Sequence, residues 1–206
     1  MAEFYLIRAS LALMSSLCEA YFLSSLSRHS RRLALYTLPI LLLSPGMFIS
    51  SSAMLPSSFS MSLVMLFFGL WLRDRRAACV YALALPVLIG WPFVGAIGIP
   101  IAIEMVFLRG EMMRLLAHGV AALAVILTPI VMADEYFYGR VVVAPWNVAM
   151  YNVIGGEGRG PGLYGEEPWT FYVKNGFLNF NIAFFLAIAS FVIVVRSLQF
   201  ALYYFA

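Results

Sequence analysis

Apolar stretches with almost no charged side chains make up most of this 206-residue chain. An α-helix needs about 20 mostly apolar residues to cross the hydrocarbon core of a bilayer. Membrane barrels instead alternate apolar and polar residues with a period of two, which these stretches do not do. The pattern therefore predicts an all-α integral membrane protein, a polytopic helical bundle with about seven candidate segments. These segments are residues 4–26, 33–50, 54–72, 77–90, 93–108, 115–133 and 180–206.

Composition and cysteine use exclude several other classes of protein. Charged residues make up only 11% of the chain and hydrophobic residues 63%, whereas about a quarter of the residues in soluble domains are charged. The net charge is +3, but the arginines lie in short clusters between apolar stretches, so we expect no nucleic-acid partner. Cys18 and Cys79 lie inside apolar stretches, and we interpret them as small buried residues and not as a disulfide or metal pair.

Arginine clusters predict the orientation in the membrane, because short cytoplasmic loops are enriched in Lys and Arg. The clusters are Arg28, Arg31 and Arg32, then Arg73, Arg75 and Arg76, then Arg109 and Arg114. All three fall on the cytoplasmic side if the chain turns at Gly90-Trp91-Pro92, and the polar tract that begins at residue 134 is then luminal. A kink within one longer helix at the same place would reverse the side of that tract. We prefer the turn, because glycine and proline at these positions favour a break between helices.

The same reading gives the domain organisation. We expect residues 1–133 to form a transmembrane bundle of about six spans, residues 134–179 a luminal loop, and residues 180–206 a final transmembrane helix. Apolar segments reach both ends of the sequence, which we interpret as an internal piece of a longer protein with a single incomplete domain. Glu19 and Glu104 fall within or near spans, where a charge at the helix centre costs about 2.5 to 3.5 kcal/mol, so they should face protein or water.

Aromatic, glycine and acidic residues crowd the tract from 134 to 179 and form distinctive runs. These runs are DEYFYG (134–139), APWN (144–147), LYGEEPWTFY (163–172) and NGFLNFN (175–181). Further runs lie upstream, namely CEAYF (18–22), SPGMF (44–48), SSSAMLPSSF (50–59) and GWPF (90–93). In this order they resemble the dolichyl-phosphate-mannose-dependent mannosyltransferases of glycosyltransferase family 22. Within that family, the chain is most similar to the α-1,2-mannosyltransferases of asparagine-linked oligosaccharide assembly.

The resemblance implies part of a C-type glycosyltransferase fold in the endoplasmic reticulum membrane. Such enzymes move mannose from dolichyl phosphate mannose to a dolichyl-diphosphate-linked oligosaccharide with inversion, in protein N-glycosylation, and need no nucleotide sugar, other cofactor or metal. Their catalytic base lies in a luminal loop upstream of a segment like residues 4–26, and a His-Lys-Glu-Glu-Arg-like stretch lies downstream. This sequence contains neither, so we assign no catalytic residue within it and expect that it is inactive by itself.

The resemblance and the residue types together give six candidate substrate-binding residues. These are Asp134, Tyr138, Arg140, Tyr164, Trp169 and Tyr172. A carboxylate accepts hydrogen bonds from sugar hydroxyls, aromatic faces suit C–H-rich surfaces, and guanidinium groups pair with phosphates.

Each candidate also has a structural interpretation. Asp134 and Glu135 would end a helix at the water interface, the aromatic residues would form an interfacial belt, and Arg140 and Arg159 would contact lipid headgroups. The glycine run at residues 155–162 would be a flexible turn and not a phosphate-binding loop, because no strand-to-helix setting accompanies it.

Two other functions remain open at this point. A sibling mannosyltransferase of glycosylphosphatidylinositol-anchor or α-1,6 branch synthesis shares the motifs around Asp134 and Trp169. A polytopic transporter, a different class, is suggested by prolines within the apolar segments and by Glu104.

Overall fold

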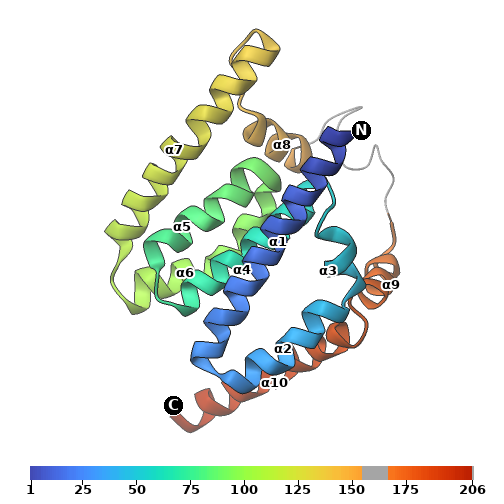
Figure 1. Ribbon diagram of the computed structural model, residues 1–206. Coiled ribbons are helices and arrows are strands. Elements are labelled where there is room, and N and C mark those ends of the chain that lie inside the picture. Colours follow the sequence, from blue (N-terminus) through green and yellow to red (C-terminus); the bar gives the residue numbers. More distant parts are fainter. Residues whose placement is uncertain (155–166, 206) are drawn as a thin grey trace. The chain divides into compact units, whose positions relative to one another are not determined.

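The computed structural model describes residues 1–154 and 167–205, and its regular structure in this part of the chain is helical, without strands (Figure 1). Most elements are α-helices, while η1 and η3 are π-helices and η2 is a 3₁₀-helix. In chain order the elements are α1 (Ala2–His29), α2 (Arg31–Leu43), α3 (Pro45–Ser50), α4 (Pro56–Leu72), α5 (Arg76–Leu85), η1 (Pro86–Gly90), η2 (Pro92–Gly98), α6 (Ile99–Ile103), η3 (Glu104–Leu108), α7 (Met112–Tyr138), α8 (Ala144–Val153), α9 (Trp169–Phe180) and α10 (Ile182–Phe205).

Two of these helices are long and apolar enough to cross a membrane, α1 with 28 residues and α7 with 27. At about 1.5 Å per residue each spans roughly 40 Å. A third candidate combines α9 with the apolar beginning of α10, which are bent by 115° relative to each other. The helical segments Pro56–Leu72, Arg76–Gly90 and Pro92–Leu108 are apolar but shorter. The expectation of an all-α chain with helices able to span a membrane is confirmed, whereas the number of spans stays a prediction.

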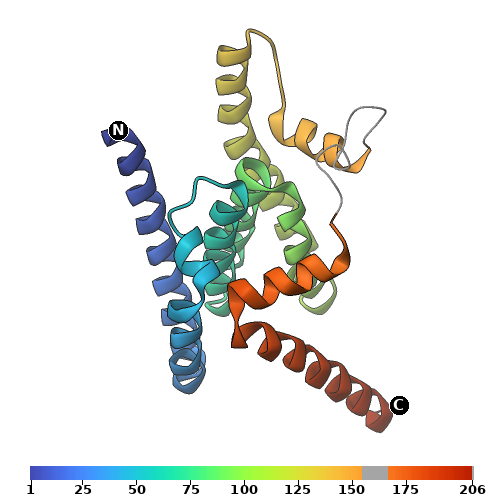
Figure 2. The same cartoon turned by 90° about the vertical axis from the view of Figure 1, so that its right-hand side faces the viewer.

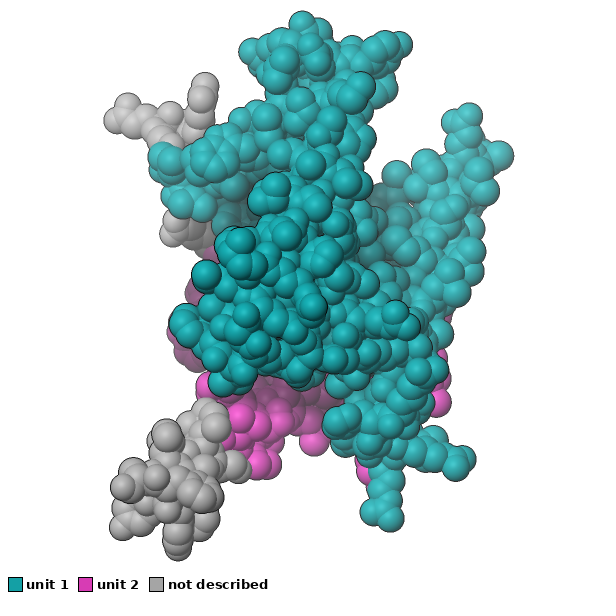
Figure 3. Space-filling view, turned by 90° about the vertical axis from the view of Figure 1, so that its left-hand side faces the viewer, with its two compact units in different colours: residues 1–35, 50–166 teal, residues 36–49, 167–206 magenta. Residues whose placement is uncertain are grey.

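The chain divides into two compact units (Figure 3). Unit 1 consists of Met1–Leu35 and Ser50–Glu166, and unit 2 of Tyr36–Ile49 and Glu167–Ala206. Helices α1 and α4 to α8 therefore belong to unit 1. Helices α3, α9 and α10 belong to unit 2, together with most of α2. The candidate residues at positions 134 to 140 lie in unit 1, and those on α9 lie in unit 2.

Small side chains allow α1 and α4 to pack closely within unit 1. Ser15 on α1 and Ser62 on α4 are buried. A Cβ atom at Gly69 of α4 would lie 2.8 Å from Cδ1 of Tyr21 and 3.2 Å from Cα of Phe22. Membrane helices pack through such small residues because lipid gives little hydrophobic drive for association, so close backbone approach must supply the contact.

The chain turns back on itself at Trp91, as the sequence predicts. Trp91 is extended, with φ −123° and ψ 109°, between the end of η1 and the start of η2. Its N–H donates to Oγ of Ser60 at 3.2 Å. After the turn, Gly98 lies so close to Leu83 that a Cβ atom would be 2.2 Å from Cδ2 of that leucine. The segments before and after Trp91 are therefore neighbours in a hairpin and not halves of one kinked helix.

An apolar core forms in unit 1 where α4, α5, α6 and η3 meet. Its buried members are Phe67, Cys79, Ala82, Ile101 and Met105. The Cys79 thiol lies 3.5 Å from the backbone carbonyl oxygen of Phe67. Both cysteines are free and buried, which confirms that they serve as small core residues.

Unit 2 contains a sharp corner between α9 and α10, seen as the orange and red helices in Figure 2. Asn181 forms the corner with a positive φ of 49°. On the α9 side, a Cβ atom at Gly176 would lie 2.5 Å from the Phe184 ring, and one at Gly46 of α3 would lie 3.0 Å from the carbonyl oxygen of Asn179. Glycine at these two positions is what allows α3 and the start of α10 to lie against α9.

Candidate functional site

Polar residues gather at two opposite ends of unit 1. At the first, which we call the arginine end, Arg73 donates hydrogen bonds to Ser24 and Ser25 near the end of α1, at 2.8 and 2.7 Å. At the second, which we call the aspartate end, Asp134 lies near the turn at Trp91 and the start of α8. Arg114 and Asp134 both belong to α7, and the 1.5 Å rise per residue separates them by about 30 Å.

Helix α7 continues through Asp134 and Glu135, whereas we expected these acids to follow the end of the helix. The helix ends at Tyr138, and Gly139 caps it with a φ of 64° and an N–H bond to the carbonyl oxygen of Glu135 at 2.9 Å. Glycine adopts positive φ without a steric penalty. The helix therefore ends at Gly139 and not where the sequence changes from apolar to polar. The predicted loop from residue 134 thus contains the last turn of α7, and also α8 and α9.

Asp134 lines a cavity of about 240 Å³. Gly90 and Pro92 form one wall, and Ala144 and Pro145 of α8 form another. The Oδ2 atom of Asp134 is buried and has no hydrogen-bond partner among the described residues. A buried carboxylate oxygen is costly without a donor, so this atom is suited to accept a hydrogen bond from a ligand hydroxyl in the cavity.

Tyr138 and Arg140 lie just beyond this cavity on the same polypeptide segment. Tyr138 is one turn after Asp134 on α7, and its side chain is exposed. Arg140 follows the capping glycine and is also exposed. Within residues 1–154 and 167–205, Arg140 forms neither an ion pair nor a side-chain hydrogen bond, so its guanidinium donors are available to an anionic group.

The aromatic candidates of α9 belong to unit 2. Trp169 is the first residue of α9, after Pro168 at the N-cap, and 75% of its surface is exposed. Tyr172 lies one turn later and is 66% exposed, with its ring 5.7 Å from that of Phe171 in an edge-on arrangement. Both rings therefore present open faces. Tyr164, Arg159 and the glycine run at residues 155–162 lie outside the described residues.

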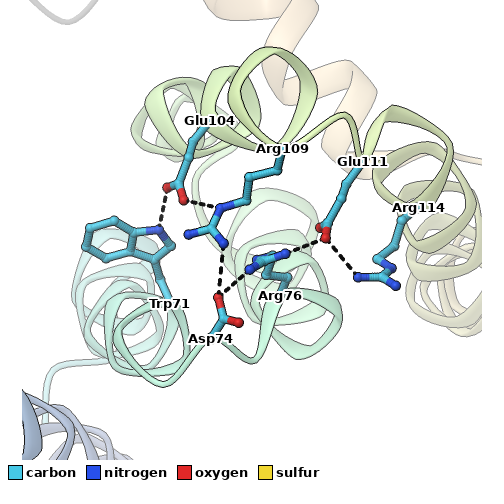
Figure 4. A network of polar contacts seen from close by, with 7 residues as sticks. All are labelled: Trp71, Asp74, Arg76, Glu104, Arg109, Glu111 and Arg114. Atoms are coloured by element: carbon cyan, nitrogen blue, oxygen red, sulfur yellow. Dashed lines mark hydrogen bonds and ion pairs between the residues drawn. The ribbon is translucent and has the colours of Figure 1, made fainter.

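The arginine end contains a network of ion pairs that sequence reasoning did not anticipate (Figure 4). Arg76 donates to Asp74 at 2.6 Å and also to Glu111. Arg114 pairs with the same Glu111 oxygen at 3.0 Å. The Arg76 guanidinium holds the pKa of the Glu111 carboxyl below its ordinary value. The network therefore ties the start of α5 to the start of α7.

A second part of the network surrounds Glu104 at the beginning of η3. The Trp71 indole N–H donates to Oε2 of Glu104 at 2.9 Å, and Nε of Arg109 donates to Oε1 at 2.5 Å. Glu104 thus faces protein partners, as expected for a carboxylate near a membrane span. The sequence shows acids and arginines together at the ends of the apolar segments. It does not show which acid bonds to which arginine.

Glu19 has a simpler environment in the middle of α1. Its Oε1 atom accepts a hydrogen bond from Ser15 one turn earlier, at 3.3 Å. Its side chain is half-buried. This agrees with the expectation that Glu19 meets a structural partner within its span.

The two ends of unit 1 therefore differ in chemical character. Asp74, Glu104 and Glu111 at the arginine end each bond to at least one arginine, although Oε2 of Glu111 is buried without a partner among the described residues. Asp134, in contrast, forms no side-chain bond with the described residues and lies beside a cavity. The aspartate end is thus the better place to hold a ligand that carries hydroxyl groups.

Comparison with known proteins gives a match over the whole length of the chain. Residues 1–205 match the Alg9-like mannosyltransferase family. The alpha-1,2-mannosyltransferase ALG9 of Mus musculus is 43% identical over 186 residues, which cover 90% of this chain and 30% of that protein. The Homo sapiens protein of the same name is 41% identical with the same coverage, and that of Schizosaccharomyces pombe is 36% identical over 90% of this chain and 34% of its own length.

No solved structure matches the chain. The chain spans about a third of the length of the curated relatives it matches. Because the match to the family model extends over residues 1–205, the chain belongs to the Alg9-like mannosyltransferase family.

Proposed function

We propose that this chain belongs to an enzyme that moves mannose from dolichyl phosphate mannose to a dolichyl-diphosphate-linked oligosaccharide, with inversion and in an α-1,2 linkage. The observation that carries the proposal is the family match over residues 1–205. The names of the mouse and human relatives support the α-1,2 linkage. A match to mannosyltransferases also favours this function over a transporter.

The proposal places the chain in the endoplasmic reticulum membrane as part of a C-type glycosyltransferase fold. The aspartate end and the tract from residue 134 to 179 would face the lumen, and the arginine end would face the cytoplasm. Two observations support this orientation. The second and third arginine clusters gather at one end of unit 1 together with the end of α1, and the first cluster follows α1 directly. Clustered arginines mark the cytoplasmic side of membrane proteins.

In this proposal Asp134 binds a substrate hydroxyl and is not the catalytic base. Its unpartnered Oδ2 atom would accept a hydrogen bond from a sugar hydroxyl in the neighbouring cavity. Trp169 and Tyr172 offer exposed aromatic faces to the C–H surface of a sugar or to a prenyl chain. Arg140, whose side chain forms no bond with the described residues, offers its guanidinium donors to a phosphate. Tyr138 and Tyr164 stay candidates for the same role as the other aromatic residues.

Mannosyl transfer in microsomes tests this proposal. Cells that lack their own α-1,2-mannosyltransferase of this family would express the full-length enzyme that contains this chain, and the accumulated lipid-linked oligosaccharides would be separated by chromatography. We expect the full-length enzyme to extend the accumulated intermediate by mannose. A full-length enzyme that inserts into the membrane but leaves the intermediate unchanged would refute the proposed function.

Asp134→Asn tests the site, with Glu135→Gln as the matched control. Both substitutions remove one carboxylate charge from the last turns of α7, but Glu135 is exposed and does not line the cavity. Losing a hydrogen bond to a charged group costs about 1.5 to 3 kcal/mol, so Asp134→Asn should lower kcat/KM by about 10- to 100-fold. Equal activities of the two variants would remove Asp134 from the substrate site while leaving the proposed function intact.

A sibling activity is the second candidate. GPI mannosyltransferase 3 of Trypanosoma brucei brucei is 36% identical over 67 residues, which cover 32% of this chain. This similarity is much shorter than that to the α-1,2 enzymes. The intermediates that accumulate in deficient cells separate the two functions. Glycosylphosphatidylinositol precursors carry a phosphatidylinositol lipid, whereas dolichyl-diphosphate oligosaccharides carry dolichol through an acid-labile diphosphate.

A further inference from the structure

The arginine end of unit 1 contains a hollow that the proposed function does not use. Its volume is about 360 Å³, and it lies between the start of α5 and the first turns of α7. Arg75 and Arg76 contribute from one side, and Arg114 and His118 from the other. Among the described residues that line it, Asp74 is the one acid. Three guanidinium groups thus surround a space that is large enough for a phosphate group.

The cations of this hollow are only partly neutralised by the network of Figure 4. Arg76 is fixed by Asp74 and Glu111, and only 15% of its side chain is exposed. Arg114 uses one nitrogen on Glu111 and is 57% exposed, which leaves most of its five N–H donors free. Arg75 is exposed, and its side chain makes neither an ion pair nor a hydrogen bond with the described residues. The hollow therefore has one fixed guanidinium group, that of Arg76, and two further ones, of Arg75 and Arg114, with donors that no described residue uses.

The hollow lies at one end of a candidate membrane helix. Helix α7 begins there and is long and apolar enough to cross a membrane. Ala117 and Val125 of this helix are exposed, and at about 100° of rotation per residue they lie on the face of α7 that carries Arg114 and His118. A ligand held by the guanidinium groups could thus lay an acyl chain along α7, which a free inorganic anion cannot do. Basic pockets at helix ends bind anionic lipid headgroups through this combination of charge and apolar surface.

From these observations we propose that the hollow formed by Arg75, Arg76, Arg114 and His118 binds the phosphate headgroup of an anionic phospholipid. Arg75 and Arg114 hold the phosphate oxygens, while Arg76 is kept in position by Asp74 and Glu111. The site is about 30 Å from Asp134 along α7, so it is independent of the substrate site and would serve to fix this end of the protein in one leaflet.

Lipid titration of the purified protein in neutral maltoside micelles tests the site. The probes are dioctanoyl phosphatidylglycerol, dioctanoyl phosphatidylcholine and inorganic phosphate, with binding followed by microscale thermophoresis. We expect saturable binding of phosphatidylglycerol and none of the other two over the same concentrations. Absence of saturable phosphatidylglycerol binding would overturn the proposal, and equally tight binding of inorganic phosphate would show a site for a soluble anion instead.

Two double variants separate a defined site from general surface charge. Arg75→Gln with Arg114→Gln removes the rim of the hollow and should weaken phosphatidylglycerol binding about 30-fold, since each arginine near a lipid phosphate contributes roughly a factor of five. Arg31→Gln with Arg32→Gln removes the same charge from an exposed helix start that does not line the hollow. Its effect should stay within about threefold, and equal losses in both variants would refute a defined site.

The single variant Arg75→Gln guards against a folding defect. The Arg75 side chain makes no ion pair or hydrogen bond with the described residues, and its backbone bonds to Leu70 and Cys79 are kept in the variant, so the variant should unfold at the wild-type midpoint. It should still weaken phosphatidylglycerol binding by about fivefold. Unchanged affinity in this variant would exclude Arg75 from the site.

Discussion

Substitution of Gly69 by alanine tests whether the close approach of α1 and α4 stabilises unit 1. The new Cβ atom would lie 2.8 Å from Cδ1 of Tyr21 and 3.2 Å from Cα of Phe22. The first contact requires the Tyr21 ring to move, and the second requires a shift of the α1 backbone. The ring cannot move freely, because the Arg73 guanidinium lies over it at 4.3 Å from the ring centroid.

The expected loss follows from three contributions. Overpacking a tight contact costs about 1 to 3 kcal/mol, and displacement of Tyr21 weakens a cation–π contact worth about 0.5 to 1 kcal/mol. Against these, alanine in place of glycine within a helix favours folding by about 1 kcal/mol. The free energy of unfolding should therefore fall by about 0.5 to 3 kcal/mol in Gly69→Ala.

Gly119→Ala is the matched control, since Gly119 lies inside α7 with no atom within 4 Å of the site of a new Cβ. It keeps the gain in helix propensity without the clash, so it should be neutral or stabilising by up to about 1 kcal/mol. Reversible unfolding of the purified protein in mixed micelles, driven by an increasing fraction of dodecyl sulfate and followed by circular dichroism, measures both. Equal midpoints for Gly69→Ala and Gly119→Ala would refute the claim that this contact is tight.

Three further changes test other parts of the fold. The lowered pKa of Glu111 beside Arg76 means that this carboxylate stabilises the fold above pH 4.5 and loses that effect as the pH falls through the lowered pKa; unfolding midpoints of wild-type protein and Glu111→Gln should therefore converge in acid, and a constant gap would contradict the pairing. Trp71→Phe removes the indole N–H from Glu104 and should lower the free energy of unfolding by about 1 kcal/mol, whereas an unchanged midpoint would show that this bond contributes nothing. Asn181→Val should cost about 1 to 3 kcal/mol because of the positive φ at that position, and Asn181→Gly should be close to neutral; identical effects of the two in the same unfolding assay would argue against a strained corner.

The sequence was most informative where one dominant force decides the structure. Continuous apolar runs predicted helices, because the backbone must satisfy its own hydrogen bonds in lipid. Gly90 and Pro92 predicted the turn at Trp91, since one frees the backbone and the other cannot continue a hydrogen-bonded helix. The burial of Cys18 and Cys79 followed from their apolar neighbours.

Other features depend on contacts between residues that are distant in the sequence. Trp71 and Glu104 are 33 positions apart, and their bond arises because the hairpin at Trp91 returns η3 to the end of α4. Composition showed that charges lie at the ends of the apolar segments, but not which carboxylate meets which arginine. The end of α7 was predicted too early for a different reason. A helix can continue into a polar sequence until a residue that adopts positive φ, here Gly139, ends it.

The two ends of unit 1 differ in how their carboxylates are bonded. At the arginine end, Arg76 and Arg109 each bond to carboxylates from neighbouring elements, so α5, η3 and α7 are held together where they meet. At the aspartate end, the cavity wall consists of a turn and a short helix, and the Asp134 oxygen has no partner among the described residues. A carboxylate with a buried oxygen and no hydrogen-bond donor destabilises the fold by itself. It follows that neutralising Asp134 should raise the free energy of unfolding while it lowers transfer, a combination that a purely structural aspartate would not give.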